Sequence, residues 1–419
     1  MSNALKLGDV AVVKGGSGFP EKYQGGSHGL PFIKVSDMNL PGNQRYIWKS
    51  NNYLNTTVYN LLKPTVFPRD TVVFAKVGAA VYLNKRRILT EDTAIDNNLM
   101  GVTATAIEPL FLYYLLQSID LAEWVQPGAL PSINQTIIEA LPIPITDRKQ
   151  QRYISEVLNA LDNQIEATQA LIDKYTAIKQ GMMADLFSRG IDPETKALRP
   201  TFEEAPELYH KTPLGMLPKG WGVKTLGEIS EKITSGSRDW AKFYSSEGDL
   251  FVRISNLTRE HVNFRWDSVK YVNIGGGSEG ERTQLQPGDI LVSITADLGI
   301  VGVVPENMGR AYINQHTALI RLSTDGENAR FIGNYLSSRC GQDQFEKNND
   351  SGAKAGINLP TIASLRCPIP EGKEQLLIAS KIDALDEVIA DLKREKSKSL
   401  SLKQGLMQDL LTGKVPVPA

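Results

Sequence analysis

The chain has 419 residues and carries 46 basic against 47 acidic side chains, a formal net charge of −1. This length predicts two or three domains, and the balanced charge excludes binding of nucleic acid by overall positive charge alone. The two cysteines, Cys340 and Cys367, and the four histidines have no metal-ligand spacing, and no apolar run is long enough to span a membrane.

Residues 1–145 are predicted to form a mixed α+β module, with 12 basic and 11 acidic side chains. Its opening, MSNALKLGDV, has no basic segment followed by an apolar stretch, so we expect a cytoplasmic protein with no membrane segment. Short apolar runs predict strands and a longer one predicts a helix. The strand candidates are residues 31–37, 70–78 and 98–106, and the helix candidate is 109–125.

A long helix is predicted over residues 146–190, because residues 147–180 contain neither proline nor glycine. Its apolar residues recur at intervals of four and three: Ile154, Leu158, Leu161 and Ile165, then Leu171, Tyr175, Ile178 and Met182. About 40 residues at ~1.5 Å each make a helix roughly 60 Å long. One such helix cannot bury its apolar stripe alone, so we expect it to pair with a second helix.

Residues 191–212 are polar, aperiodic and contain prolines, which predicts a linker. A second α+β module is predicted over 213–370, with 17 basic and 17 acidic side chains. Its strand candidates are 250–257, 289–296 and 317–322, and its helix candidate is 328–347. A second long helix is predicted over 371–415, with the apolar stripe Ile378, Ile382, Leu385, Ile389, Leu392, Leu402, Leu406 and Leu410.

The second half of the chain repeats the first. At a shift of 224, residues 132–187 and 356–411 are identical at 20 of 56 positions, and AIKQGMMADLF is matched by SLKQGLMQDLL. Further upstream the shift is 219, where PFIKVSD is matched by LFVRISN and PRD by PGD. The predicted fold is therefore α+β, a tandem repeat with pseudo-twofold symmetry. Its two globular modules are separated by two long helices that form an antiparallel coiled coil.

Two repeated features predict local packing. Asn134 and Asn358 are placed as N-caps of short helices, and the flanking isoleucines Ile133, Ile138, Ile357 and Ile362 are placed as hydrophobic staples. Gly181 and Gly405, near the ends of the two long helices, predict close helix packing.

Polar residues beside strand ends are the candidate DNA contacts. Lys, Arg, Asn and Gln suit base edges in the major groove, and Ser or Thr suits phosphate. The candidates are Lys34, Ser36, Lys76, Arg86, Arg87 and Asn97 in the first module, and Arg253, Ser255, Asn256, Thr295, Gln315, His316 and Lys354 in the second. The shift of 219 sets Lys76 opposite Thr295. The alternative interpretation is that each is a solvated strand-end residue or a turn cap.

The layout and three motifs resemble the specificity (S) subunit of type I restriction-modification systems. TPLGMLPKGWGVKTLGEI, before the second module, is similar to the sequence with which that family opens a module. LFSRGID is similar to the end of its central conserved region, and KQGLMQDLLTGKV to the end of its C-terminal helix. The likeness covers essentially the whole chain and is weakest within the modules, where the family itself varies.

The resemblance implies that each module is a target recognition domain that reads one half of a bipartite site in double-stranded DNA. It implies that the long helices hold the two domains at a fixed distance and dock two modification (methyltransferase) subunits. Restriction (translocase/nuclease) subunits join them in the full complex. Two equivalent surfaces related by pseudo-twofold symmetry suit two identical partners. S-adenosylmethionine, ATP and Mg are expected on the partner subunits, and no cofactor is expected on this chain.

The sequence predicts no catalytic activity of the chain's own. It has no Asn-Pro-Pro-aromatic loop, no P-loop and no nuclease-like acidic cluster, and KGGSG lacks the strand-glycine-helix context of a nucleotide site. We therefore expect a non-catalytic subunit for DNA methylation and phage defence. Two other interpretations stay open: a sequence-specific DNA-binding subunit of another defence or methylation complex, and a coiled-coil scaffold whose modules bind sugars or proteins.

Overall fold

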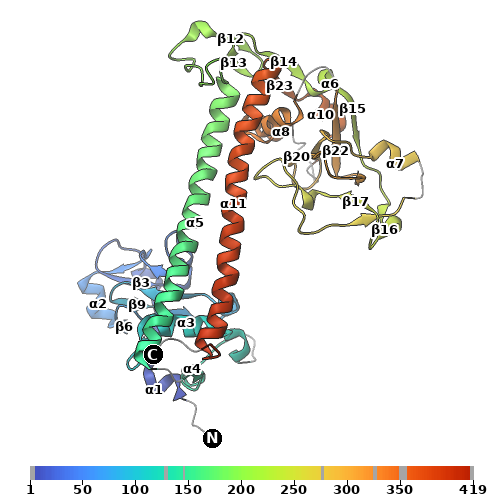
Figure 1. The fold of residues 1–419 in the computed structure, drawn as a ribbon. Helices are drawn as coiled ribbons and strands as arrows, with labels where there is room; N and C mark the ends of the chain where they lie inside the picture. The colour runs from blue at the N-terminus through green and yellow to red at the C-terminus, as the bar shows by residue number, and fades with distance from the viewer. Residues whose placement is uncertain are drawn as a thin grey trace. The chain divides into compact units, whose positions relative to one another are not determined.

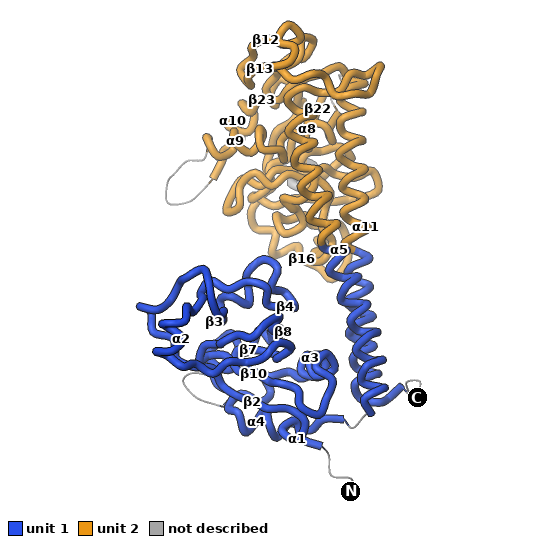
Figure 2. Tube along the Cα trace, turned by 90° about the vertical axis from the view of Figure 1, so that its left-hand side faces the viewer, with its two compact units in different colours: residues 1–169, 394–419 blue, residues 170–393 orange. Residues whose placement is uncertain are grey.

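The computed structural model describes residues 5–126, 131–144, 147–274, 278–323, 328–348 and 356–415. The chain divides into two compact units (Figure 2). Unit 1 holds residues 1–169 and 394–419, and unit 2 holds residues 170–393. Each unit thus combines one globular module with a part of both long helices, α5 (Arg148–Ser188) and α11 (Gly372–Leu411).

The module of unit 1 contains a five-stranded sheet in the order β2-β10-β7-β8-β4 and a four-stranded sheet in the order β5-β3-β9-β6. The strands are β1 (Leu5–Lys6), β2 (Ala11–Gly15), β3 (Leu30–Ile33), β4 (Tyr46–Ile47), β5 (Tyr53–Leu54), β6 (Val66–Phe67), β7 (Val72–Ala75), β8 (Arg86–Leu89), β9 (Thr93–Ile95), β10 (Leu99–Ala104) and β11 (Pro142–Ile143). The helices are α1 (Leu7–Val10), α2 (Thr56–Leu62), α3 (Pro109–Ser118) and α4 (Gln135–Glu139).

Helix α3 packs on β7, β8 and β10 and forms the centre of the unit 1 core. Its Phe111 and Leu116 are fully buried, in one cluster with Ile154 and Leu158 of α5 and Leu410 of α11. The module and its part of the long helices therefore share one core. Arg45 adds polar contacts to α5, since its guanidinium donates to Asn159 at 3.0 Å and Asn163 at 2.6 Å.

The module of unit 2 contains two four-stranded sheets, β15-β22-β19-β20 and β16-β18-β17-β21, and two two-stranded ones. The strands are β12 (Tyr209–Thr212), β13 (Gly215–Pro218), β14 (Gly222–Thr225), β15 (Ser230–Ser235), β16 (Tyr244–Ser245), β17 (Asp249–Val252), β18 (Tyr271–Val272), β19 (Ile290–Ser293), β20 (Val301–Val303), β21 (Ala311–Ile313), β22 (Thr317–Leu322) and β23 (Arg366–Ile369). The helices are α6 (Leu226–Ile229), α7 (Ser278–Thr283), α8 (Ala329–Ser337), α9 (Arg339–Lys347) and α10 (Leu359–Ser364).

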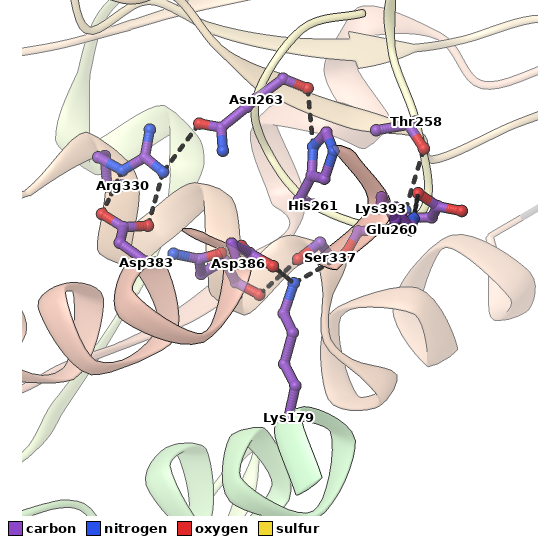
Figure 3. A network of polar contacts seen from close by, with 11 residues as sticks. Lys179, Thr258, Glu260, His261, Asn263, Arg330, Ser337, Asp383, Asp386 and Lys393 are labelled. Atoms are coloured by element: carbon purple, nitrogen blue, oxygen red, sulfur yellow. Dashed lines mark hydrogen bonds and ion pairs between the residues drawn. The ribbon is translucent and has the colours of Figure 1, made fainter. Parts of the chain in front are cut away.

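Unit 2 is built on the same plan. Phe331 and Leu336 of α8 are buried in one cluster with Leu186 of α5 and Ile378 and Ile382 of α11. The loop of residues 258–263 is hydrogen-bonded to both long helices (Figure 3). Lys179 of α5 donates to the Glu260 carbonyl at 2.7 Å, and Lys393 of α11 reaches the Glu260 carboxylate at 2.6 Å.

In each unit the two long helices run antiparallel (Figure 1). In unit 1, Asp162 pairs with Lys403 at 2.7 Å and Gln169 pairs with Lys396, so residue numbers rise on one helix as they fall on the other. In unit 2, Lys179 pairs with Asp386 at 2.5 Å. The antiparallel pairing and the duplicated α+β modules predicted from the repeat are confirmed.

The predicted apolar seam is correct only in part. Ile154, Leu158 and Ile165 are buried, as are Ile378, Ile382 and Ile389. However, Leu171 and Ile178 are 41% and 43% exposed, and Leu402 is 54% exposed. The buried face of α5 in unit 2 is one position further along and contains Ile172, Lys179, Met183 and Leu186. The spacing of apolar residues predicted the wrong face because one buried position on α5 holds a lysine, Lys179, which is paired with Asp386.

Several local predictions are also decided by the structure. The helix expected over 328–347 is two helices, α8 and α9, because Ser338 is extended and its hydroxyl caps α9 by accepting from Gly341 at 3.4 Å. Asn134 and Asn358 are N-caps as predicted, accepting from Ile137 N at 2.9 Å and Thr361 N at 2.8 Å.

The segment over 191–212 is packed rather than extended away from unit 2. Ile191 and Tyr209 are buried, and the segment ends in the β12–β13 hairpin. The buried Glu374 carboxylate of α11 accepts from Ile191 N at 2.8 Å, from Trp221 Nε1 at 3.0 Å and from the Arg199 guanidinium. One carboxylate thus joins the end of α5, the connecting segment and the start of the second module to α11.

Candidate nucleic-acid interface

Each module has a corner where a glycine turn meets a polar loop. In unit 1, a Cβ at Gly16 would lie 2.1 Å from the Asp96 carbonyl oxygen, and in unit 2 a Cβ at Gly236 would lie 2.3 Å from the Asn314 carbonyl oxygen. Only glycine allows such a close approach of two backbones. The residues after these glycines, Ser17 and Ser237, form parallel bridges to Asp96 and Asn314 respectively. We call these two places the unit 1 corner and the unit 2 corner.

The polar loop of each corner is shaped by an Asp or Asn side chain. The Asp96 carboxylate accepts from Asn98 N at 2.7 Å, and the Asn314 amide oxygen accepts from His316 N at 3.1 Å. The two loops therefore have the same turn and hold their following residues at equivalent positions. Asn97 is exposed and Gln315 is half-buried at the equivalent site.

The pairing of Lys76 with Thr295 is wrong by one residue. Ala75 lies opposite Leu99 in unit 1, and Ser293 lies opposite Thr317 in unit 2, so the shift between these strands is 218. The reason is the turn before each strand, where Asp70 (φ 65°) corresponds to Gly288 (φ 83°) and not to Asp289. Thr295 is consequently the counterpart of Val77, and both form bridges to the segment that precedes a cap asparagine.

Three predicted residues of the second module are brought together at the unit 2 corner. The Thr295 hydroxyl lies 2.7 Å from His316 Nδ1, and Gln315 Nε2 lies 3.0 Å from His316 Nε2. Because the amide nitrogen of Gln315 can only donate, His316 Nε2 accepts and its Nδ1–H donates to Thr295. The chain of hydrogen bonds holds a histidine and an amide side by side, with further donors and acceptors available to a base edge.

The two arginines of the run NKRRI serve the fold. Arg86 is 1% exposed, and its guanidinium donates to the carbonyl oxygens of Asn84 at 2.6 Å and Ile119 at 2.5 Å. Burial lowers the pKa of Arg86 to about 10. Arg87 donates to the Met38 carbonyl at 3.1 Å, and burial lowers its pKa as well. The Arg86 guanidinium is thus closed off from solvent, whereas the half-buried Arg87 guanidinium is held against backbone carbonyls.

The candidates at the ends of β3 and β17 occupy equivalent turns. The backbone amides of Lys34 and Arg253 donate to the side chains of Asp37 at 2.8 Å and Asn256 at 3.1 Å. Asn256 is 3% exposed, and its amide nitrogen donates to the carbonyl oxygens of Arg265 and Ser268, so its role is structural. Ser36 and Ser255 are exposed.

The side chains beside these turns have partners of their own. Lys34 Nζ donates to Gln24 at 2.9 Å, and Arg253 Nη2 donates to Ser268 at 3.1 Å. Each cation is therefore held by a partner within its own module. Lys354 lies outside the described residues.

One cation at the unit 2 corner was missed by the sequence reading. Arg282 of α7 is exposed, and its guanidinium donates to the Ser235 carbonyl and the Ser237 hydroxyl, both at 2.7 Å, beside Gly236. At the unit 1 corner the Lys76 ammonium has the same place, since a Cβ on Gly15 would be 2.7 Å from its Nζ. The cation at the unit 1 corner follows β7, and the cation at the unit 2 corner belongs to α7. The two residues do not align in the repeat, so the repeat gives no sign that they correspond.

The described residues contain no group of three or more His, Cys, Asp and Glu side chains arranged to hold a metal ion. Among the described helices, none is both long and apolar enough to cross a membrane.

Comparison with known proteins identifies relatives over both halves of the chain. A family model described as "Type I restriction modification DNA specificity domain" matches residues 2–176 and again residues 218–402. The chain is 28% identical over 317 residues to the putative type I restriction enzyme MjaX specificity subunit of Methanocaldococcus jannaschii, covering 74% of this chain and 69% of the relative. It is 20% identical to the EcoBI specificity subunit of Escherichia coli, covering 97% and 84%.

Solved structures show the same fold. The type I restriction-modification S subunit from M. genitalium superposes with a TM-score of 0.60 at 14% identity, covering 100% of this chain and 98% of that one. A chain from a study of complex assembly in a type I system superposes with a TM-score of 0.53 at 17% identity, covering 98% and 97%.

Proposed function

Because this chain belongs to the family of type I restriction-modification DNA specificity proteins, we propose that it gives such a complex its DNA sequence specificity. The observation that carries the proposal is the duplicated corner. The two corners share their glycine turn and loop geometry, yet one presents Asn97 and Asn98 and the other Gln315 and His316. Equivalent frames with different hydrogen-bonding groups suit two half-sites of different sequence.

In this function each module reads one half of a bipartite double-stranded site, and the long helices dock two modification subunits. Restriction subunits complete the assembly. S-adenosylmethionine, ATP and Mg²⁺ bind to these partners, which carry out the chemistry, and the chain acts in the cytoplasm without catalysis of its own. Its net charge of −1 supports a shared interface, because phosphate contacts supply much of the affinity for DNA and partner subunits can provide them.

The test is to express the chain with the modification subunit of its own system in a host that lacks DNA methylation, and to map methylated adenines. We expect one bipartite sequence with a nonspecific spacer. Exchanging residues 1–145 for the first module of a relative is expected to change one half of that sequence and leave the other half intact. Methylation that does not depend on this chain, or a pattern that the exchange leaves unchanged, would contradict the proposal.

A further inference from the structure

At the unit 2 corner, three side chains are joined by hydrogen bonds in a row. Gln315 Nε2 lies 3.0 Å from His316 Nε2, and His316 Nδ1 lies 2.7 Å from the Thr295 hydroxyl. The backbone fixes the middle of the row, because His316 N donates to the Asn314 amide oxygen at 3.1 Å and its carbonyl oxygen accepts from Ile294 N at 3.0 Å. The hydroxyl, the imidazole and the amide are therefore attached as one unit to the ends of β19 and β22.

The hydrogen bond to His316 decides what the Gln315 amide can offer to DNA. A glutamine amide has two N–H donors and one oxygen acceptor, and one of these N–H groups is given to His316 Nε2. Among the described residues, none hydrogen-bonds to the amide oxygen of Gln315, and this oxygen is not closed off from solvent. The amide thus keeps one donor and one acceptor for a base.

This pair of groups matches one base edge in the major groove. Adenine offers a donor, N6–H, beside an acceptor, N7, so a donor and an acceptor on one amide complement both. Guanine offers two acceptors, O6 and N7, which require two donors. An amide that has already given up one N–H therefore favours adenine over guanine.

A cation lies at the same corner. Arg282 is exposed, and its guanidinium donates to the Ser235 carbonyl and the Ser237 hydroxyl, both at 2.7 Å. Ser237 is bridged to Asn314, the residue before Gln315. Contacts to phosphates fix the position of a protein on the duplex, whereas amides read base edges. The unit 2 corner thus combines a group that can position the duplex with a group that can read a base.

The unit 1 corner has no such row of hydrogen bonds. Asn97 takes the place of Gln315, is exposed, and has no side-chain hydrogen bond to any residue that the structure describes. Val77 takes the place of Thr295 and has no hydroxyl. The Asn97 amide is therefore not held in one orientation by the described part of unit 1, and the inference concerns unit 2 alone.

We propose that Gln315 reads an adenine in the half-site of unit 2, with His316 and Thr295 as positioning residues that set the orientation of its amide. The inference rests on the proposed function and names the base that this corner selects. His316 Nε2 accepts only while Nδ1 carries the proton, and the Thr295 hydroxyl favours this state by accepting from Nδ1–H. Without the hydroxyl, the proton can move to Nε2. The Nε2–H group then donates to the amide oxygen and leaves both N–H groups of Gln315 for guanine.

The experiment measures base discrimination by the full-length chain assembled with its modification subunits. Competition binding compares the mapped target with duplexes in which one A·T pair of the unit 2 half-site is replaced by G·C, or one adenine by 7-deazaadenine, which lacks N7. In wild type, one position is expected to lose roughly 10- to 100-fold in affinity on replacement by G·C, and 7-deazaadenine is expected to weaken binding there as well. Gln315→Ala is expected to remove both effects at that position.

Thr295→Val tests the positioning role, because this side chain does not touch the base. It is expected to lower the preference for A·T over G·C at that position by about tenfold, since the amide then offers two donors to guanine. Thr295→Ser keeps the hydroxyl and is expected to preserve the preference. Val77→Thr adds a hydroxyl at the equivalent place in unit 1 and is the matched control, which should change neither half-site. Discrimination at the other positions of the site reports that each variant is folded.

Three results would overturn the inference and leave the proposed function standing. They are a Gln315→Ala variant that affects no position, a wild-type preference for guanine at the position that it affects, and an unchanged preference in Thr295→Val. A wild-type complex that binds DNA without sequence preference would overturn both.

Discussion

Lys179 of α5 donates a hydrogen bond to Asp386 of α11 at 2.5 Å in unit 2, and only 8% and 5% of these side chains are exposed. Unit 1 repeats the pair with the roles of the helices exchanged, since Lys403 of α11 contacts Asp162 of α5 at 2.7 Å. Each long helix therefore carries one buried Asp and, 17 residues later, a Lys that pairs with the Asp of the other helix; the side chain of Lys179 is 8% exposed and that of Lys403 is 13% exposed. Antiparallel pairing matches both, whereas parallel pairing in register would bury like charges together. The ion pairs thus select the orientation of the helices.

The unit 2 ion pair leads to a stability prediction. Lys179→Met is expected to lower the free energy of unfolding by roughly 3–5 kcal/mol, because it leaves the Asp386 carboxylate buried without its cation. Adding Asp386→Leu is expected to recover most of the loss, since two apolar residues need no counter-charge. Urea titration of the wild type, both single variants and the double variant measures the coupling. A single variant as stable as wild type would show that the pair contributes nothing.

His261 predicts the pH dependence of unit 2. It lies in the loop that contacts both long helices, near Asp386, Lys179 and Glu260 (Figure 3), and burial lowers its pKa below 6.5. The unfolded chain then binds this proton more readily than the folded one, so this group destabilises the fold as the pH falls through about 6.5. We expect the loss of melting temperature between pH 7.5 and pH 5.5 to be smaller in His261→Gln than in wild type. An equal loss in both proteins would refute a role for His261.

The cap of α10 can be tested by substitution. Asn358→Ala removes the acceptor of the Thr361 amide and is expected to cost ~1 kcal/mol of unfolding free energy, while Asn358→Ser is expected to restore most of it. Denaturant unfolding of the two variants provides the measurement, with Asn134→Ala and Asn134→Ser as the equivalent pair in unit 1. If alanine and serine behave alike, the cap hydrogen bond is not what the position provides.

The corners predict separable effects on DNA binding. Gln315→Ala in the assembled complex is expected to weaken discrimination in one half-site by roughly 1–3 kcal/mol for the base it contacts, and Asn97→Ala is expected to do so in the other half-site only. Competition binding against single-base variants of the target distinguishes the two. Each variant serves as the control for the other, and loss of discrimination in both half-sites from one substitution would contradict separate reading by the two corners.

The repeat made the fold predictable from the sequence, because identity at a constant shift reveals the helices and N-caps without reference to packing. Details that depend on distant partners were not predictable. Apolar periodicity favoured Ile178 over Lys179 for the buried face, since the pattern contains no sign of the aspartate on the other helix. Arg86 was a candidate DNA contact, but one of the two carbonyls that it binds belongs to Ile119, 33 residues away. Arg282 reaches its corner from a separate helix.

Helix length is expected to set the spacer of the DNA site. Helices α5 and α11 are continuous over 41 and 40 residues. A deletion within them therefore changes the distance between the modules attached to the two ends of the helices. Removing Ala167–Ala170 together with Asp391–Arg394 shortens each helix by about 6 Å, which corresponds to roughly two base pairs at ~3.4 Å per pair. The matched deletion leaves both ion pairs between the helices in place.

The sequences of the two half-sites should stay the same, because no module residue changes, while the nonspecific spacer becomes one or two base pairs shorter. Methylation mapping of the mutant decides the question, and an unchanged spacer in an active mutant would mean that something other than the helices sets the distance.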